Sequence, residues 1–242
     1  MSSGASTTST IWKLARSRLE KQAFEEDAVH LFAENAVAGE RNGFKVGRQA
    51  VTVSGTVLRV ASRDSSQAAS RATYDMYGQV RRVVHLARGA PVMLISNLRT
   101  SLGLVNGAVG KVVAVELREG AEADDGGLRG AVSADKVRYV VVDFPQYNGP
   151  AIWPDHPKWV PVAPCSTRHK KKKQWERFQL PLALAWGMTI HKSQGLTFTG
   201  RVVVDFAHQP TYQPVAKPGL AFVGMSRCTD FALQAFRNLP GF

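Results

Sequence analysis

The feature that most constrains this fold is a regular alternation of apolar and helical segments from Phe178 onward. The segments follow one another as strand, helix, strand, helix and strand, over residues 180–186, near 189, 201–206, 219–228 and 231–236. Strands that alternate with helices pack as a parallel sheet with helices on its faces. We therefore expect an α/β fold built on a parallel sheet.

The middle of the chain follows a different pattern, because short β-branched runs are separated there by Gly, Asn or Pro. That pattern predicts strands rather than helices. The predicted strands cover 49–60, 79–86, 91–96, 111–117 and 137–144. Before them, the apolar spacing predicts a helix over 11–24 and a short strand over 28–32. We expect a small β lobe that is inserted in the α/β lobe.

The chain is strongly basic, since 31 Lys and Arg against 19 Asp and Glu give a formal net charge of +12. Such a charge favours a polyanionic partner, nucleic acid above all, through phosphate contacts and counterion release. Arg168 and His169 open a basic run that continues through four lysines, Lys170, Lys171, Lys172 and Lys173. This run is either a solvated loop or a nucleic-acid contact.

Metal and membrane sites are not expected. Cys165 and Cys228 have no metal-ligand spacing, so we expect no bound metal and a reducing, intracellular location. That location is the nucleus or the mitochondrion in a eukaryotic cell, and otherwise the cytoplasm. No apolar run approaches the roughly 20 residues of a membrane span, so we expect no membrane partner.

Polar side chains and two glycines cluster over 186–197, where a buried strand gives way to a predicted helix. Ligands bind at the carboxyl ends of strands in open α/β sheets, and helix amino termini suit phosphate. Local chemistry leaves a second interpretation open, in which the helix is capped and His191 and Lys192 are merely solvated. A hydrolytic triad on His191 and Ser193 lacks a supporting acid or nucleophile elbow.

A second candidate segment, 219–229, is apolar and ends with one arginine, Arg227, before Cys228 and Thr229. An arginine in such a place can stabilise the charge of a transferring phosphoryl group. Taken alone, Arg227 is explained more simply as a side chain that snorkels to solvent or pairs with an acid.

The two segments together resemble a known family. The sequence LPLALAWGMTIHKSQGLT at 180–197 is similar to motif V of superfamily 1 DNA helicases of the RecD and PIF type, and FVGMSR at 222–227 is similar to their motif VI. AVHLFAENA from Ala28, followed by Asn42, resembles the strand and helix that open the second RecA-like domain. GAPVMLISNL at 89–98 and GLVNGAVG at 103–110 resemble a further stretch of the family.

The resemblance implies a role for each matching residue. Arg227 corresponds to the arginine finger, which reaches the ATP γ-phosphate from across the nucleotide cleft. Motif V, which links that cleft to the track of single-stranded DNA, corresponds to Thr189, His191, Lys192, Ser193, Gln194, Gly195 and Thr197. Further DNA-binding candidates are Asn97, Asn106, Lys170, Lys171, Lys172 and Lys173. Gly187 stands where the family usually has Ala, and Gly224 and Met225 replace Ala-Leu.

The resemblance also implies a division of the chain. We expect a flexible tail with a short helix over 1–27 and a RecA-like domain over 28–107 and 179–242. The inserted β lobe over 108–178 corresponds to the family's small SH3-like insertion. Trp186, Trp175 and Phe198 are candidates for base stacking, although each is explained more simply as a core residue.

The sequence contains no P-loop, G-x-x-x-x-G-K-[ST], which in these motors binds the phosphates and Mg²⁺. The nearest approach is Gly110-Lys111, where Val112 replaces the hydroxyl residue. Two runs, 140–144 and 202–206, resemble a Walker B strand that ends in Asp, here Asp143 and Asp205, but are interpreted as ordinary sheet strands. We therefore expect the C-terminal portion of an ATP-dependent 5′–3′ DNA helicase, which does not hydrolyse ATP alone.

In this interpretation ATP and Mg²⁺ act in the intact enzyme, and none is bound by this chain alone. The expected partners are single-stranded DNA and a P-loop RecA-like domain, either upstream in the same protein or in a separate one. A second hypothesis is a non-catalytic module, derived from a helicase, that binds single-stranded nucleic acid. The net charge of +12 and the missing P-loop motivate it.

Overall fold

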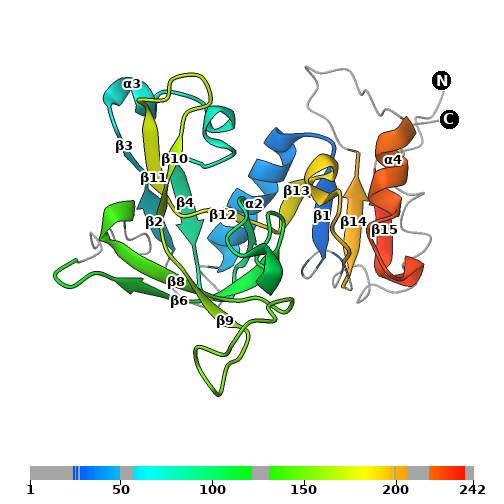
Figure 1. Ribbon diagram of the computed structural model, residues 1–242. Coiled ribbons are helices and arrows are strands. Elements are labelled where there is room, and N and C mark those ends of the chain that lie inside the picture. Colours follow the sequence, from blue (N-terminus) through cyan, green and yellow to red (C-terminus); the bar gives the residue numbers. More distant parts are fainter. Residues whose placement is uncertain are drawn as a thin grey trace. The chain divides into compact units, whose positions relative to one another are not determined.

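The computed structural model describes Phe24, Glu26 and residues 28–49, 57–121, 131–198, 200–206 and 218–237. The chain divides into two compact units (Figure 1). The first comprises Met1–Gly43 and Trp186–Phe242, and the second comprises Phe44–Ala185. The second unit is therefore inserted in the sequence of the first.

The first unit is built on a four-stranded sheet in the order β13-β1-β14-β15, in which all neighbours are parallel. Its strands are β1 (Val29–Phe32), β13 (Gly187–Thr189), β14 (Val202–Asp205) and β15 (Gln234–Arg237). Leu31, Val203 and Val204 are fully buried, as is typical of parallel strands that are covered on both faces. The predicted α/β fold class and the strands over 28–32 and 201–206 are confirmed.

Two helices of the first unit are described over their full length. Helix α2 (Asn35–Gln49) follows β1 and runs on into the second unit, and helix α4 (Pro218–Met225) precedes β15. Helix α4 confirms the prediction over 219–228 except for its last three residues. The helix predicted over 11–24 lies outside the described residues apart from Phe24, which is buried in a cluster with Ala28, Val203 and Ala235.

Two predictions for the first unit differ from the structure. The helix expected near Thr189 is only a single 3-10 turn, Ile190–Ser193. The strand expected over 231–236 begins as a 3-10 turn, Phe231–Leu233, because the Asp230 side chain accepts a hydrogen bond from the Ala232 N–H at 2.8 Å. Only β15 then pairs with β14.

The second unit is rich in antiparallel strands. Its largest sheet has the order β12-β5-β6-β8-β9, with antiparallel pairs throughout. These strands are β5 (Pro91–Leu94), β6 (Val109–Leu117), β8 (Val137–Asp143), β9 (Trp159–Val162) and β12 (Leu182–Leu184). The strands predicted over 91–96, 111–117 and 137–144 are confirmed, as is the insertion of a β-rich unit.

Two smaller sheets complete the second unit. One joins β4 (Val83–Leu86), β2 (Leu58–Ala61) and β7 (Ala131–Ser133), and the other joins β10 (Cys165–Arg168), β11 (Glu176–Gln179) and β3 (Arg63–Asp64). A short helix, α3 (Gln67–Ser70), and three 3-10 turns, Tyr74–Tyr77, Thr100–Leu102 and Ala134–Lys136, connect these strands. Only the ends of the strands predicted over 49–60 and 79–86 are strand among the described residues.

The boundaries of the inserted unit differ from those expected at 108 and 178. Strand β5 pairs with both β6 and β12, so residues that were expected in the RecA-like domain belong to the inserted sheet. The single strand predicted over 180–186 is in fact the crossing between the units. Leu182–Leu184 pairs antiparallel with β5, whereas Gly187–Thr189 pairs parallel with β1. One apolar run thus serves two sheets, which composition cannot reveal.

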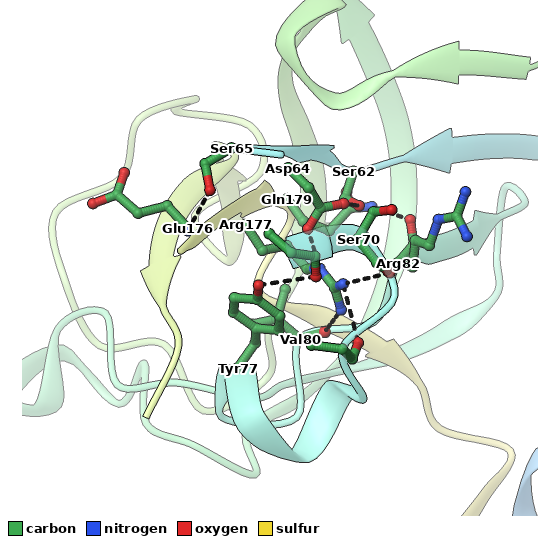
Figure 2. A network of polar contacts seen from close by, with 12 residues as sticks. Ser62, Asp64, Ser65, Ser70, Tyr77, Val80, Arg82, Glu176, Arg177 and Gln179 are labelled. Atoms are coloured by element: carbon green, nitrogen blue, oxygen red, sulfur yellow. Dashed lines mark hydrogen bonds and ion pairs between the residues drawn. The ribbon is translucent and has the colours of Figure 1, made fainter. Parts of the chain in front are cut away.

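A buried ion pair organises the second unit. Arg177 and Asp64, whose side chains are 1% and 5% exposed, meet with 2.7 Å between Nε and Oδ1 (Figure 2). The Arg177 guanidinium also donates to the carbonyl of Val80 at 3.1 Å and to those of Ser70 and Ala72 at 3.4 Å. A buried charge is tolerated only when it is paired and hydrogen-bonded, as this one is. The pair therefore ties β11 to β3 and to the 70–80 segment.

The ring of Tyr77 lies 4.2 Å from the Arg177 guanidinium and completes this network. Its hydroxyl donates to the carbonyl of Ala69 at 3.0 Å. Burial raises the pKa of Tyr77, and the charge of Arg177 opposes part of that rise.

None of the helices within the described ranges has the length and apolar character that a membrane span requires.

Candidate functional site

The candidate site of the first unit lies where the parallel strands end. Strands β1, β13 and β14 run in the same direction, so Phe32, Thr189 and Asp205 mark the same edge of the sheet. Thr189 and Asp205 are buried there. The segment that follows β13 therefore leaves the sheet at the edge where open α/β sheets bind ligands.

Residues 189–197 form a tight turn with buried anchors and exposed polar groups. Thr189 is buried, and Ser193 is fully buried with its hydroxyl donating to the Ile190 carbonyl at 2.7 Å. Gly195 has a φ of 80°, which favours glycine because L side chains rarely adopt it. The outward residues are His191, Gln194, Gly195 and Thr197, with Lys192 half-buried. Buried Thr189 and Ser193 thus fix the backbone of the turn, and the outward side chains stay accessible.

Arg227 follows the end of α4 and is held by neutral acceptors. Its Nε donates to the Val223 carbonyl at 3.0 Å, and its Nη2 donates to the Ser226 hydroxyl at 2.7 Å. Its Nη1 donates to the Leu196 carbonyl at 3.3 Å. Within the described residues no carboxylate pairs with Arg227, so the explanation by an acidic partner is not supported. Its positive charge therefore has no carboxylate partner in the described part of the chain.

The two candidate segments are joined. Phe198 and Cys228 form a parallel β-bridge, in which the Phe198 N–H donates to the Arg227 carbonyl at 2.8 Å. The Thr229 N–H donates in turn to the Phe198 carbonyl at 3.1 Å. Together with the hydrogen bond from Arg227 to Leu196, these bonds join residues 189–198 directly to residues 222–229.

Close packing explains the unusual Gly224. A Cβ at Gly224 would lie 2.8 Å from Cγ1 of Val204, so only glycine lets α4 approach β14 this closely (Figure 1). The Gln234 side chain also donates to the Gly224 carbonyl at 3.0 Å. The glycine therefore sets the distance between the sheet and the helix that leads to Arg227.

Gly187 is likewise enclosed, and Asn42 holds it by two hydrogen bonds. The Asn42 side chain donates to the Gly187 carbonyl at 2.7 Å and accepts from the Gly187 N–H at 2.9 Å. Strand β13 is the edge of its sheet, and Asn42 pairs the backbone groups that this edge would otherwise present. Helix α2 is thereby fastened two residues before Thr189. Sequence reasoning placed Asn42 in the resemblance and gave it no role.

The remaining DNA-binding candidates belong to the second unit. Asn97 and Asn106 are exposed, and the Asn97 side chain accepts a hydrogen bond from the Asn106 N–H at 2.7 Å. The four lysines lie at the tip of the β10–β11 hairpin, and all are exposed: Lys170, Lys171, Lys172 and Lys173. The structure thus brings Asn97 and Asn106 together and groups the lysines on one turn.

The lysine turn has a defined conformation, because it is built on a buried histidine. Nδ1 of His169 accepts from the Lys171 N–H at 3.1 Å and from the Lys172 N–H at 3.0 Å. The ring of His169 packs edge-on against Trp175, with 5.3 Å between centroids. Nζ of Lys172 lies 3.9 Å from the centroid of the Trp175 ring. The turn presents its lysines from a fixed backbone.

The three stacking candidates are placed differently. Trp186 is buried, so it is a core residue. Trp175 is half-buried and in contact with Lys172, and half-buried Phe198 lies in the bridge to Cys228. The two Walker B-like runs form the sheet strands β8 and β14, as interpreted from the sequence.

An aromatic cluster escaped sequence reasoning. Trp153, His156 and Trp159 gather in the loop between β8 and β9, and His156 stacks on Trp159. The signal was present as the run WPDHPKW at 153–159, which repeats an aromatic residue followed by proline.

In the described part of the chain there is no group of three or more His, Cys, Asp or Glu side chains placed to hold a metal. Burial raises the pKa of the Cys165 thiol, which disfavours the thiolate.

Comparisons with known proteins agree with this geometry. The model for the 2B domain of the DNA helicase Pif1 matches residues 73–115, which lie within the second unit. The human ATP-dependent DNA helicase PIF1 is 33% identical over 191 residues, or 76% of this chain and 23% of the human protein. PIF7 of Trypanosoma brucei brucei is 33% identical over 165 residues, or 64% of this chain and 16% of that protein.

Solved structures show the same fold. Pif1 helicase from Candida albicans has a TM-score of 0.59 and 27% identity, covering 88% of this chain and 45% of that one. Bacteroides Pif1 bound to single-stranded DNA has a TM-score of 0.57 and 20% identity, covering 86% and 40%. This chain spans about a quarter of the length of the human relative. The fold is RecA-like, and the matched part of the chain is similar to the C-terminal region of Pif1-type helicases of superfamily 1B.

Proposed function

We propose that this chain supplies the second RecA-like side of the nucleotide cleft in an ATP-dependent 5′–3′ DNA helicase, together with part of its single-stranded DNA track. The observation that carries the proposal is Arg227, a cation held by neutral acceptors, with no carboxylate partner among the described residues, at the junction of two segments that resemble motifs V and VI. The relatives that the chain matches are ATP-dependent DNA helicases. Those proteins are much longer, so their activity enters here as a proposal.

Arg227 is assigned the role of arginine finger. Hydrogen bonds to Val223, Ser226 and Leu196 fix the guanidinium without neutralising it. An arginine of this kind stabilises the charge that develops on the transferring γ-phosphoryl group. The P-loop that binds ATP and Mg²⁺ belongs to another RecA-like domain, in the same protein or in a partner. This chain alone is inactive as an ATPase.

The turn over 189–197 is assigned the coupling between the cleft and DNA. The hydrogen bond from Arg227 to the Leu196 carbonyl and the bridge at Phe198 link the finger directly to this turn. A movement of Arg227 on ATP binding would therefore shift the exposed groups of His191, Gln194 and Thr197. Buried Thr189 and Ser193 position the turn, and Lys192 adds a cation to it.

The DNA track in the second unit is assigned to Lys170, Lys171, Lys172, Lys173, Asn97 and Asn106. The lysines offer phosphate contacts that ignore sequence, as a translocating protein requires. Asn97 and Asn106 offer exposed amides on a loop that their own hydrogen bond closes.

A second candidate function is a non-catalytic module that binds single strands. The net charge of +12, together with exposed lysines on an ordered turn, favours it. Both functions predict that the chain binds single strands with steep salt dependence. They differ in whether Arg227 takes part in ATP hydrolysis.

The test joins the chain to a P-loop RecA-like domain and compares the wild type with Arg227→Ala and Arg227→Lys. Arg227→Ala should lower ATP turnover by roughly 10³-fold or more while single-strand affinity is kept. Arg227→Lys should recover little, because an ammonium cannot form the same planar fork. Near-normal turnover of Arg227→Ala would leave the binding module as the better account.

A further inference from the structure

The loop between β8 and β9 carries three aromatic rings in a preformed arrangement. The rings of His156 and Trp159 are stacked, with 3.6 Å between centroids and 7° between planes. Trp153 meets Trp159 edge to face at 6.3 Å. Trp153 and Trp159 are half-buried, whereas His156 is exposed. The stack therefore has an inner end at Trp159 and an outer end at His156.

Two successive turns build this stack, and the sequence dictates both. The His156 N–H donates to the Trp153 carbonyl at 3.0 Å, and the Trp159 N–H donates to the His156 carbonyl at 3.1 Å. Pro154 and Pro157 each follow the first residue of one turn, the position at which proline presets the backbone. His156 and Trp159 thus stand at the two ends of one turn, which places their rings in reach of each other.

The base of the loop is also fixed. The Tyr147 hydroxyl donates to the Pro150 carbonyl at 3.0 Å, and Nζ of Lys158 donates to the Tyr147 carbonyl at 2.5 Å. A Cβ at Gly149 would collide with the Tyr147 hydroxyl, so the loop closes tightly around that ring. Little ordering is left to be done on binding, which favours affinity.

We propose that the His156–Trp159 stack is a platform for an unpaired base of single-stranded nucleic acid. Parallel rings at this spacing continue naturally into a third planar ring, and base stacking on aromatic side chains tolerates any sequence. The proposal deepens the proposed function, on which it rests, by naming a site that the lysine turn and motif V do not include. The chain's net charge of +12 supplies the attraction for the strand.

Stacking, not charge, is the contribution of this loop. Of its exposed charged residues, Asp155 is acidic and Lys158 is basic. The ammonium of Lys158 is engaged with the Tyr147 carbonyl. Opposite Trp159 across the sheet lies Asp143, with Lys111 beyond it on the next strand. The local charges therefore nearly cancel, and the loop should change affinity without changing its salt dependence.

The test measures binding of a fluorescent oligodeoxythymidylate of about 12 nucleotides to the full chain at several salt concentrations. His156→Ala should weaken binding roughly five- to a hundredfold, with the slope of log affinity against log salt unchanged. His156→Phe keeps a ring without the imidazole nitrogens and should retain most of the affinity. Phe44→Ala removes another exposed ring from the second unit, 60% accessible, and should have no effect.

A second measurement locates the contact without relying on affinity. The same oligonucleotide with one 5-iodo-deoxyuridine is photo-crosslinked, and the modified peptide is identified by mass spectrometry. A crosslink within 147–159 is expected, and its absence together with unchanged affinity of His156→Ala would overturn the platform. In that case strand binding by the wild type would still support the proposed function. A wild-type chain that binds no strand would contradict both.

Discussion

The two units expose polar groups in different ways. In the first unit the polar groups emerge where fully buried parallel strands end, and the backbone of two joined turns holds them. In the second unit they stand on loops and a hairpin of an antiparallel framework, which is fastened from inside by the Arg177–Asp64 ion pair. The comparison teaches that Arg227 is positioned by the end of helix α4 and a neighbouring turn, whereas the lysine-bearing hairpin stands on a framework with its own buried ion pair.

The largest effect on stability should come from breaking that anchor. Asp64→Ala leaves the Arg177 guanidinium buried without its carboxylate, which should destabilise the second unit by about 3–5 kcal/mol. Urea denaturation followed by hydrogen exchange would show which unit opens. The matched control is Glu176→Ala, which removes the exposed pair with Arg168 and should cost less than about 1 kcal/mol. Equal losses in the two variants would contradict the role of Asp64 as an anchor.

Replacing the hairpin lysines should separate binding from folding. With Lys170, Lys171, Lys172 and Lys173 changed to Gln, single-strand affinity at about 0.1 M salt should fall roughly ten- to a hundredfold. The salt slope should become shallower by up to about 3, because fewer counterions are released. Stability should hardly change, since all four side chains are exposed. An unchanged slope would mean that the turn is only a solvated loop.

Asn42 offers the corresponding test in the first unit. Asn42→Ala removes both partners of the Gly187 backbone and should destabilise the unit by about 1–3 kcal/mol. Faster hydrogen exchange at Gly187 would localise the effect. Asn42→Asp keeps the acceptor and loses the donor, so its cost should be intermediate. No change in exchange at Gly187 would show that the edge of β13 does not depend on Asn42.

Tyr77 gives the smallest effect, and its sign follows from burial. Because the pKa of folded Tyr77 lies above 10.0, the unfolded chain loses this proton first as the pH rises. The free energy of unfolding should therefore fall as the pH rises from about 10 to the folded pKa. Denaturation of Tyr77→Phe at about pH 9 and about pH 11 should show a smaller fall than the wild type. Identical falls would contradict the assignment.

The sequence predicted the first unit far better than the second. Its buried strands are continuous apolar runs, so pattern and resemblance both pointed to the strand that ends at Thr189 and to the helical segment before Arg227. The division predicted at 108 and 178 differs from the two compact units, because the pairing of β5 with β12 is a long-range contact that local composition does not encode. Strands β9, β10 and β11 were missed because β9 contains a proline and β10 and β11 are mostly polar.

Side-chain detail was the least predictable level. Nothing in the sequence marks Asp64 as the partner of Arg177, 113 residues away. The aromatic loop was overlooked because two turns bring its rings together. In the sequence, the apolar pattern marks residues 153–159 only as a polar connecting segment. The reason for Gly187 in place of the usual Ala is a matter of packing, because Phe32 and Ala38 lie close to where a Cβ would be. The sequence alone does not show these neighbours.

The most direct test of the account asks whether Arg227 acts in the transition state of ATP hydrolysis. The chain, joined to a P-loop domain, would be titrated with ADP and with ADP and aluminium fluoride, which mimics the transferring phosphoryl group. Arg227→Ala should weaken binding of the aluminium fluoride complex by roughly 10³-fold or more while ADP affinity stays the same. Equal affinity of the wild type and Arg227→Ala for that complex would contradict the central claim.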